Sequence, residues 1–359
     1  MPHMKAARLH GPRDIRIEEI PHPGPPGPGE ALIRIGVVGI CGSDMHVYRH
    51  AKIGDTNLEG PLVLGHEFSG VVEAIGDPAE SALDGEFQQL KVGTRVAVDP
   101  AFPCGQCEWC ERGDPNLCVD LPFCGLWPTD GCLAEYIRVP TKNCFPVPDQ
   151  FSDAEIALLE PFAIAVHAVD LAHVRTGQSI ALFGAGPVGL CLLEALKAAG
   201  AGPIFVADRL DWRLDLAKRQ GADETWNVDQ SDAVAGILKS TQGRGVDIAI
   251  EAAHGGEAVG WAAESTAHGG RLLVVGIDPD DRLTLKHSTA RRKGLTITMV
   301  RRMKLTYPRA IRLLERGSVN LAPLVSHRLP LEKTAEAFEL CADYQDGVVK
   351  AIVEVDVNR

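Results

Sequence analysis

A glycine-rich turn between a strand and a helix constrains the fold of this chain more than any other feature. The stretch SIALFGAGPVGL places Gly184, Gly186 and Gly189 in a G-x-G-x-x-G spacing, directly after an apolar run. Gly184 permits a tight turn, Gly186 lets a pyrophosphate approach the backbone, and Gly189 lets helix and strand pack closely. Pro187 and Val188 open the helix, whose free N–H groups and positive dipole end favour phosphate. The stretch predicts a dinucleotide site.

Strand-like and helical stretches alternate around this turn. The apolar runs SIALFG, PIFVAD, VDIAIE, RLLVVG and LTITMV are separated by helical stretches such as PVGLCLLEALKAAG and RLDLAKRQG. This alternation is typical of a parallel sheet wound on both faces. It predicts a Rossmann-fold domain over residues 162–301, with a boundary near Pro161. Beyond Met299 the alternation stops, so we expect the tail to complete the first domain.

The second strand of the alternation ends at Asp208, 24 positions after Gly184. A carboxylate there accepts hydrogen bonds from the adenosine ribose hydroxyls and repels a 2′-phosphate, which favours NAD over NADP. Arg209 follows directly and argues the other way, because arginine pairs with a 2′-phosphate. We also assign Arg213 to the nucleotide site.

The first part of the chain has a different texture. The proline and glycine run PHPGPPGPGE predicts an exposed turn, and from Leu32 to about Val147 short apolar runs rich in valine and isoleucine are separated by Gly and Pro. This pattern predicts a barrel-like β domain. The segment DPAESALDGEFQQLK is expected to be a polar surface insertion.

Length and charge exclude several classes of protein. A chain of 359 residues suits two domains. Its net charge of −12 repels nucleic acid, and this charge also argues against a zinc module that binds nucleic acid. No window approaches the roughly 20 apolar residues that span a bilayer, and no signal peptide is recognisable. We expect a soluble, cytoplasmic protein without a membrane partner, whose ten cysteines stay reduced and indicate metal before disulfides.

Four cysteines form a C-x2-C-x2-C-x7-C array in CGQCEWCERGDPNLC, at Cys104, Cys107, Cys110 and Cys118. Four thiolates close a tetrahedron around Zn²⁺ and leave no position for substrate, so we predict a structural zinc site. An iron–sulfur cluster is the competing hypothesis. The other cysteines outside the motifs are expected to pack as small apolar side chains: Cys124, Cys132, Cys144, Cys191 and Cys341.

A separate pattern joins Cys41 in GICGSDMHVY to the His66-Glu67 pair in PLVLGHEFSG. These two motifs, the four-cysteine lobe, EPFAIAVHA, GAGPVG and HRLPLEKTAEAFEL occur in the order of one family. The sequence resembles the zinc-dependent medium-chain dehydrogenases, within them the sorbitol/polyol dehydrogenase branch. The resemblance implies an α/β protein with a GroES-like catalytic domain (residues 1–161 and 302–359, with the zinc lobe at about 100–120) and a Rossmann NAD-binding domain.

The resemblance implies a catalytic zinc held by Cys41, His66 and Glu67, with Glu160 in LLEPF either binding the zinc or holding its water. Three protein ligands and one exchangeable position make a zinc that acts on a substrate oxygen. Together with the cysteine lobe, two zinc ions per chain are expected. Hydride then passes from the alcohol carbon to the nicotinamide, giving a ketone or aldehyde.

Two further side chains carry the proton, and four line the substrate pocket by resemblance. Ser43 resembles the first hydroxyl of a proton relay, and His46 is the expected exit. Leu126 and Met303 stand where polyol dehydrogenases commonly have a threonine and a tyrosine, so the pocket loses two hydroxyls and should bind a polyhydroxylated chain less specifically. The four pocket positions are Phe123, Leu126, Arg302 and Met303.

The leading hypothesis is therefore an NAD-dependent dehydrogenase of secondary alcohols such as polyols, sugars or diols. An L-threonine 3-dehydrogenase-type enzyme is the alternative on the same scaffold. A catalytically inactive nucleotide-binding relative is the alternative from another class, and the complete ligand set of Cys41, His66, Glu67 and Glu160 argues against it. The resemblance also suggests a homotetramer.

Overall fold

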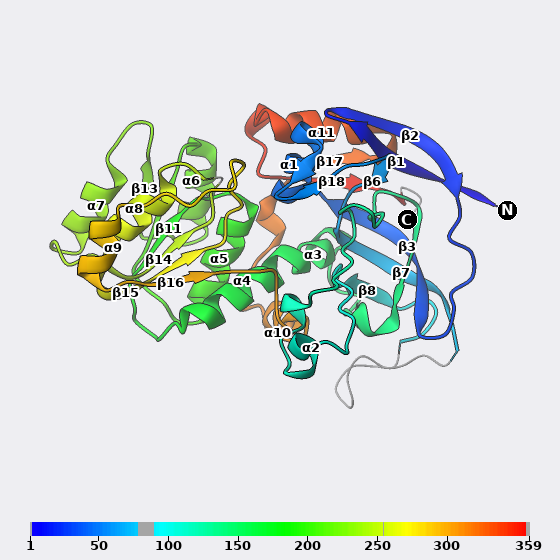
Figure 1. The fold of residues 1–359 in the computed structure, drawn as a ribbon, viewed down its shortest axis with the longest axis horizontal. Coiled ribbons are helices and arrows are strands. Elements are labelled where there is room, and N and C mark those ends of the chain that lie inside the picture. The colour runs from blue at the N-terminus through cyan, green and yellow to red at the C-terminus, as the bar shows by residue number, and fades with distance from the viewer. Residues whose placement is uncertain (1, 78–89, 254, 357–359) are drawn as a thin grey trace. The chain divides into compact units, whose positions relative to one another are not determined.

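The chain forms two structural units, and the second is inserted into the first (Figure 1). The structure is a computed structural model that describes residues 2–77, 90–253 and 255–356. The first unit comprises Met1–Glu160 and Val325–Arg359, and the second comprises Pro161–Leu324. Most of the segment expected to be a polar insertion, DPAESALDGEFQQLK, lies outside the described residues.

The first unit is built on a seven-stranded sheet in which strands from both ends of the chain meet. Its order is β10-β8-β7-β3-β18-β17, with β9 also pairing with β3. The central strand β3 pairs on one side with β7 and on the other with β18, so the last strand of the chain completes the middle of the sheet. The strands are β3 (Glu30–Gly39), β7 (Glu67–Ile75), β8 (Arg95–Val98), β9 (Tyr136–Pro140), β10 (Cys144–Pro146), β17 (Val325–Pro330) and β18 (Lys350–Glu354).

A smaller sheet and short helices surround this sheet. The three-stranded sheet has the order β2-β1-β6, and β4 pairs with β5 in a small hairpin. Buried aliphatic and aromatic side chains, among them Ile33, Tyr48, Phe68 and Phe338, form one core between these elements. The remaining elements are β1 (His3–Gly11), β2 (Asp14–Pro21), β4 (Lys52–Ile53), β5 (Thr56–Asn57), β6 (Leu62–Val63), α1 (Gly42–His50), α2 (Glu108–Glu111), α3 (Asp153–Ala157) and α11 (Thr334–Ala342).

The second unit contains a six-stranded sheet, all parallel, in the order β13-β12-β11-β14-β15-β16. The order reverses at β11, which is followed by the glycine turn. Ligands bind at such a reversal in doubly wound sheets. The strands are β11 (Ile180–Phe183), β12 (Ile204–Asp208), β13 (Glu224–Asn227), β14 (Val246–Glu251), β15 (Thr266–Val274) and β16 (Thr296–Met299).

Helices flank the sheet of the second unit, which is the predicted Rossmann architecture (Figure 1). The five strands expected from apolar runs all form, and β13 adds a sixth at one edge. No helix of the described residues is both long and apolar enough to cross a membrane. The helices are α4 (Leu159–Ala172), α5 (Pro187–Ala198), α6 (Asp211–Arg219), α7 (Ala233–Ser240), α8 (Ala258–Ser265), α9 (His287–Lys293) and α10 (Tyr307–Glu315).

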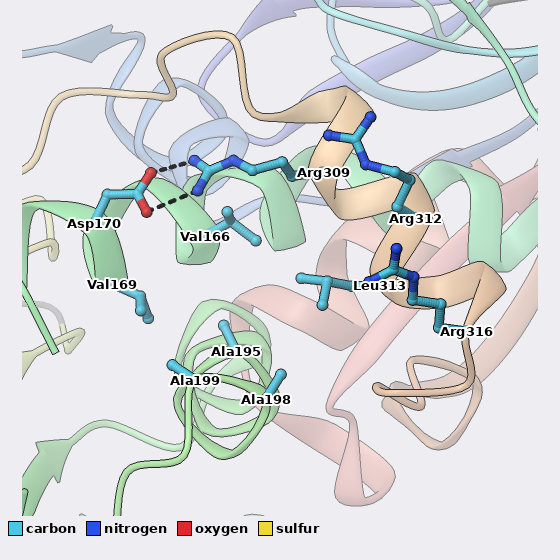
Figure 2. Close-up of a pocket in the computed structure, with 10 residues that line it drawn as sticks. All are labelled: Val166, Val169, Asp170, Ala195, Ala198, Ala199, Arg309, Arg312, Leu313 and Arg316. Atoms are coloured by element: carbon cyan, nitrogen blue, oxygen red, sulfur yellow. Dashed lines mark hydrogen bonds and ion pairs between the residues drawn. The ribbon is translucent and has the colours of Figure 1, made fainter. Parts of the chain in front are cut away.

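The second domain boundary differs from the expected one. We predicted that the chain returns to the first domain at residue 302, whereas the contacts place that return at Val325. The reason is the packing of α10 on its neighbours: Thr306 Oγ1 donates to the Ala163 carbonyl at 2.8 Å, and Arg309 pairs with Asp170 of α4. Figure 2 shows this ion pair beside a pocket of about 360 Å³, with alanines of α5 opposite. Helix α10 therefore packs on α4 and belongs to the second unit.

Candidate active site

Asp44 joins the two motifs that contain Cys41 and His66. Cys41 is the N-cap of α1, and its N–H donates to Asp44 Oδ2 at 3.0 Å. The other oxygen, Asp44 Oδ1, lies 3.3 Å from His66 Nδ1 and accepts from the Gly65 N–H at 3.4 Å. One buried carboxylate thus fixes the start of the helix and the orientation of the imidazole ring. The sequence analysis did not single out Asp44, although its place three residues after Cys41 is typical of a capping residue.

Cys41, His66 and Glu67 offer one ligand atom each within 4.8 Å of one another. Glu67 is fully buried and His66 nearly so, while Cys41 is partly exposed. Ser43 Oγ lies 3.2 Å from His66 Nε2, on the side of the ring away from Asp44. Burial lowers the pKa of His66, but the negative groups of Asp44 and Cys41 outweigh it and hold that pKa well above its usual value. Sulfur, nitrogen and oxygen donors in one cluster are the set that zinc prefers.

Glu160 supplies a further buried carboxyl in the first turn of α4. Its side chain is 2% exposed, and its Oε2 has no hydrogen-bond partner within the described part of the chain. Burial raises the pKa of Glu160 to about 8; His66 and Lys350 oppose this shift, while Glu67 and Asp99 add to it. A buried carboxyl oxygen without a protein partner fits a position that addresses a bound metal or its ligand.

Lys350 is a residue of the site that the sequence analysis missed. Its Nζ lies 2.8 Å from Glu67 Oε1 and 2.6 Å from Glu67 Oε2, and both side chains are buried. A signal was present, because Lys350 stands alone within the apolar run GVVKAIV, and a lysine in such a run requires a buried partner. The partner was not predictable, because it lies 283 positions earlier in the chain.

Three other predicted residues lie in the first unit. His46 is buried, 9% exposed, on α1 one turn after Ser43. The Phe123 ring lies 5.0 Å from the His66 ring, centroid to centroid. Leu126 follows in the same turn, where its N–H donates to the Phe123 carbonyl at 3.1 Å. The structure therefore brings Phe123 close to the cluster.

The last two predicted pocket residues belong to the second unit. Arg302 has a left-handed backbone, with φ of 55°, and Met303 is buried. They precede α10, so the boundary found at Val325 places them with the cofactor sheet rather than with the GroES-like domain.

The four cysteines of the lobe lie together. Their ligand atoms, from Cys104, Cys107, Cys110 and Cys118, all fall within 4.8 Å of one another. Cys107 precedes the short helix α2, and backbone N–H groups, that of Cys110 first, lower the pKa of the Cys107 thiol to about 6. Four sulfurs in one knot fit a tetrahedral metal, because thiolate is the binding form. Outside the lobe, Cys124, Cys132, Cys144 and Cys191 are buried, as expected for packing residues, and Cys341 is partly exposed.

The three positions of the turn are occupied by glycine for different structural reasons. Gly184 adopts φ of 108°, and a Cβ there would lie 2.5 Å from the Ala252 carbonyl oxygen. A Cβ on Gly189 would lie 1.9 Å from the Gly184 carbonyl oxygen, so this position holds α5 against β11. Among the described residues, a Cβ on Gly186 would meet only Arg213 Nη1, at 3.5 Å. The fold thus requires Gly184 and Gly189, whereas Gly186 keeps the helix N-terminus open to a ligand.

Asp208 and Arg209 have separate partners at the end of β12. Asp208 Oδ2 accepts from the Ala185 N–H at 2.6 Å, and its Oδ1 accepts from the Leu210 N–H at 2.9 Å. The carboxylate therefore stands directly beside the glycine turn. Arg209 Nε lies 3.0 Å from Asp229 Oδ2, and both side chains are largely exposed. Asp229, which the sequence analysis did not name, forms an ion pair with Arg209, the residue that favoured NADP.

One unit with a dinucleotide turn and another with a thiolate, imidazole and carboxylate cluster define a metal-dependent oxidoreductase. Two family models match: the alcohol dehydrogenase GroES-like domain at residues 27–149 and the zinc-binding dehydrogenase domain at residues 187–316. The chain is 39% identical to a sorbitol dehydrogenase of Bacillus subtilis (strain 168), over 98% of this chain and 97% of the relative.

Solved structures agree with this similarity. An oxidoreductase of unknown specificity from Escherichia coli superposes with a TM-score of 0.91 at 30% identity, covering 99% of this chain and 100% of the other. The 2R,3R-butanediol dehydrogenase of Bacillus subtilis superposes with a TM-score of 0.86 at 32% identity, covering 98% and 100%. The chain belongs to the zinc-dependent medium-chain alcohol dehydrogenase family. It is a zinc-dependent enzyme that oxidises an alcohol or polyol with a nicotinamide dinucleotide.

Proposed function

We propose that the chain oxidises a secondary alcohol of the polyol, sugar or diol class to a ketone and reduces NAD to NADH. The observation that carries this proposal is the cluster of Cys41, His66 and Glu67, with Ser43 Oγ 3.2 Å from His66 Nε2. The relatives that share the fold are named for sorbitol and for butanediol, and both substrates have secondary hydroxyls.

Cys41, His66 and Glu67 would hold the catalytic zinc. The Glu160 carboxyl would face the exchangeable position of that zinc. When bound, zinc would lower the pKa of the substrate hydroxyl, and NAD would be the acceptor of the hydride. The second zinc is held by the cysteine lobe and has a structural role, because four thiolates leave no position for substrate. Two zinc ions per chain follow from these two donor sets.

The chain's own residues manage the proton. The Ser43 hydroxyl, beside His66 Nε2, is placed to accept the proton that leaves the substrate hydroxyl. His46 lies three residues further along α1 and therefore on the same face of the helix, where it takes the proton onward. The released proton and the hydride together balance the oxidation of the alcohol.

The substrate pocket combines an aromatic wall with few hydroxyls. Phe123 contacts the His66 ring, and Leu126 follows it in the same turn. By resemblance, Arg302 and Met303 of the second unit are also assigned to substrate binding, Arg302 as a cation for a substrate oxygen and Met303 as an apolar contact. Such a pocket suits a short diol better than a fully hydroxylated chain, because unpaired polar groups are costly to bury.

The nucleotide site selects NAD. The Asp208 carboxylate stands beside the glycine turn, where it pairs with ribose hydroxyls and repels a 2′-phosphate. Arg209 is engaged by Asp229, which supports the same choice. Gly184, Gly186, Gly189, Pro187, Val188 and Arg213 complete the proposed site.

We also propose a cytoplasmic homotetramer. In the described residues β16 forms an edge of the parallel sheet and pairs only with β15, and its Ile297 and Met299 are exposed. An exposed apolar edge strand is a natural place for a second copy to pair. Sedimentation of the purified chain measures the assembly directly.

A substrate panel followed by NADH absorbance tests the function. We expect activity on butanediol, xylitol or sorbitol and none on L-threonine, with NAD preferred. Metal analysis before and after a mild chelator should show two zinc ions and then one, with activity lost and the fold kept. Oxidation of L-threonine alone, or no turnover with any member of the panel in fully metallated protein, would contradict the proposal.

A further inference from the structure

The buried pair of Lys350 and Glu67 crosses the central strand of the first unit. Glu67 begins β7 and Lys350 begins β18, and these two strands flank β3 on opposite sides. The two side chains meet over Gly39 of β3: a Cβ there would lie 2.3 Å from Glu67 Oε2. Gly39 therefore provides the gap in which the ion pair forms.

The ammonium group also contacts the backbone. Lys350 Nζ also donates to the carbonyl of Ile40 at 2.8 Å. Ile40 directly precedes Cys41, so this bond holds the lysine close to the cluster. The lysine is 1% exposed and the glutamate is fully buried, so water screens neither charge. Glu67 thus has two neighbours. Its carboxylate pairs with the Lys350 ammonium group, and one of its oxygens lies within 4.8 Å of the Cys41 and His66 donor atoms.

We propose that Lys350 is a positioning residue that weakens the bond between Glu67 and the catalytic metal. This inference rests on the proposed metal site. A carboxylate has lone pairs for both partners, but a fixed positive charge withdraws the carboxylate from a second cation and opposes that cation directly. The Cys41 thiolate and the Glu67 carboxylate would neutralise a divalent ion completely. Lys350 restores a positive charge to the site, which favours an ionised substrate hydroxyl.

Cobalt substitution in the full-length protein tests this role. The visible absorption of Co²⁺ reports its ligands, and competition with a chelator reports its affinity. For Lys350→Met we expect Co²⁺ to bind the open site about tenfold or more tightly, because a nearby positive charge is removed. The spectrum should shift as Glu67 binds more strongly, and kcat should fall while KM for NAD stays unchanged. Lys350→Arg keeps the charge and should resemble the wild type.

Two controls separate this role from a structural one. Lys197→Met removes the lysine of another ion pair, with Glu194 at 3.2 Å on α5, and should leave cobalt affinity unchanged. The cobalt absorption of the cysteine lobe serves as an internal reference. If Lys350→Met does not fold, Lys350→Gln carries the test, because its amide still donates to the Ile40 carbonyl without a charge.

The outcomes distinguish this inference from the proposed function. In one outcome, Cys41→Ser abolishes Co²⁺ binding at the open site, but Lys350→Met keeps the affinity and spectrum of the wild type. That result overturns only the role of Lys350. If Cys41→Ser takes up as much metal as the wild type, the proposed metal site fails and the role of Lys350 fails with it.

Discussion

Asp44 and His66 form a buried carboxylate–imidazole pair, with 3.3 Å between Asp44 Oδ1 and His66 Nδ1. This contact fixes the ring so that the other nitrogen, Nε2, lies toward Ser43. A metal-binding histidine whose second nitrogen donates to a carboxylate is oriented and made more basic. Asp44 therefore supports the proposed metal site without contributing a ligand of its own.

We predict that Asp44→Asn lowers zinc affinity at the open site by about 10- to 100-fold, the usual cost of removing a supporting partner. Asparagine can still accept from the Cys41 N–H, so α1 keeps its cap and the melting temperature should change little. Chelator competition measures the affinity. Asp170→Asn, which changes an exposed carboxylate of the second unit, is the control. Unchanged affinity in Asp44→Asn would refute the role.

Glu160 should make the stability of protein without catalytic zinc depend on pH. Its pKa is about 8 in the folded chain, against an ordinary value of 4.5. A raised pKa means that the folded state binds the proton more tightly than the unfolded state. The contribution to stability is thus complete below about pH 4.5 and is lost as the pH rises towards 8, at up to roughly 1.4 kcal/mol per pH unit.

Glu160→Gln removes this dependence while keeping the shape. We predict that zinc-depleted Glu160→Gln gains stability relative to zinc-depleted wild type as the pH rises from 5 to 8, by an amount on the order of a few kcal/mol. Urea unfolding at several pH values measures the difference. A constant difference over this range would show that Glu160 ionises normally in the folded chain.

The glycine turn offers a matched pair of variants. Gly189→Ala forces a Cβ to within 1.9 Å of the Gly184 carbonyl oxygen and should cost about 1 to 3 kcal/mol of stability. Gly186→Ala meets only Arg213 Nη1, at 3.5 Å, so the fold should tolerate it while NADH affinity falls at least about tenfold. Thermal unfolding and NADH fluorescence separate the two effects. Equal losses of stability would contradict the assignment of Gly186 to the ligand.

Asp229 should contribute to cofactor choice by holding Arg209. We predict that Asp229→Asn raises kcat/KM with NADP severalfold relative to NAD, because the released guanidinium can pair with a 2′-phosphate. Asp215→Asn removes an exposed carboxylate of neighbouring α6 and controls for the general change in charge. The same rise in both variants would indicate a nonspecific electrostatic effect.

Local sequence patterns predicted most of the fold of the second unit. Apolar runs identify β11, β12 and β14, because each strand is buried on both faces. The edge strand β13 has the sequence ETWN and no buried residue, so it carries no such signal. Helix α10 is amphipathic whichever unit it packs against, and it is the contacts of α10 with α4 that place it in the second unit, which ends at Leu324.

The candidate site shows the same division between local and distant information. Cys41, His66 and Glu67 stand in short motifs with recognisable chemistry, and the structure brings their donor atoms together. Lys350 enters through the pairing of β3 with β7 and β18, and no local pattern specifies that pairing. Asp229 likewise becomes relevant only once β12 and β13 lie side by side.

The pairing of β3 with β18 also sets an order of events during synthesis. All of the second unit emerges from the ribosome before Lys350, whereas β3 and β7 have been translated long before their neighbour β18 exists. The cofactor-binding sheet can therefore form on the growing chain, while residues 37–39 of β3 still lack their partner β18 and Glu67 lacks its countercharge. The nascent protein should acquire a nucleotide site first and a finished metal site only near the end of translation.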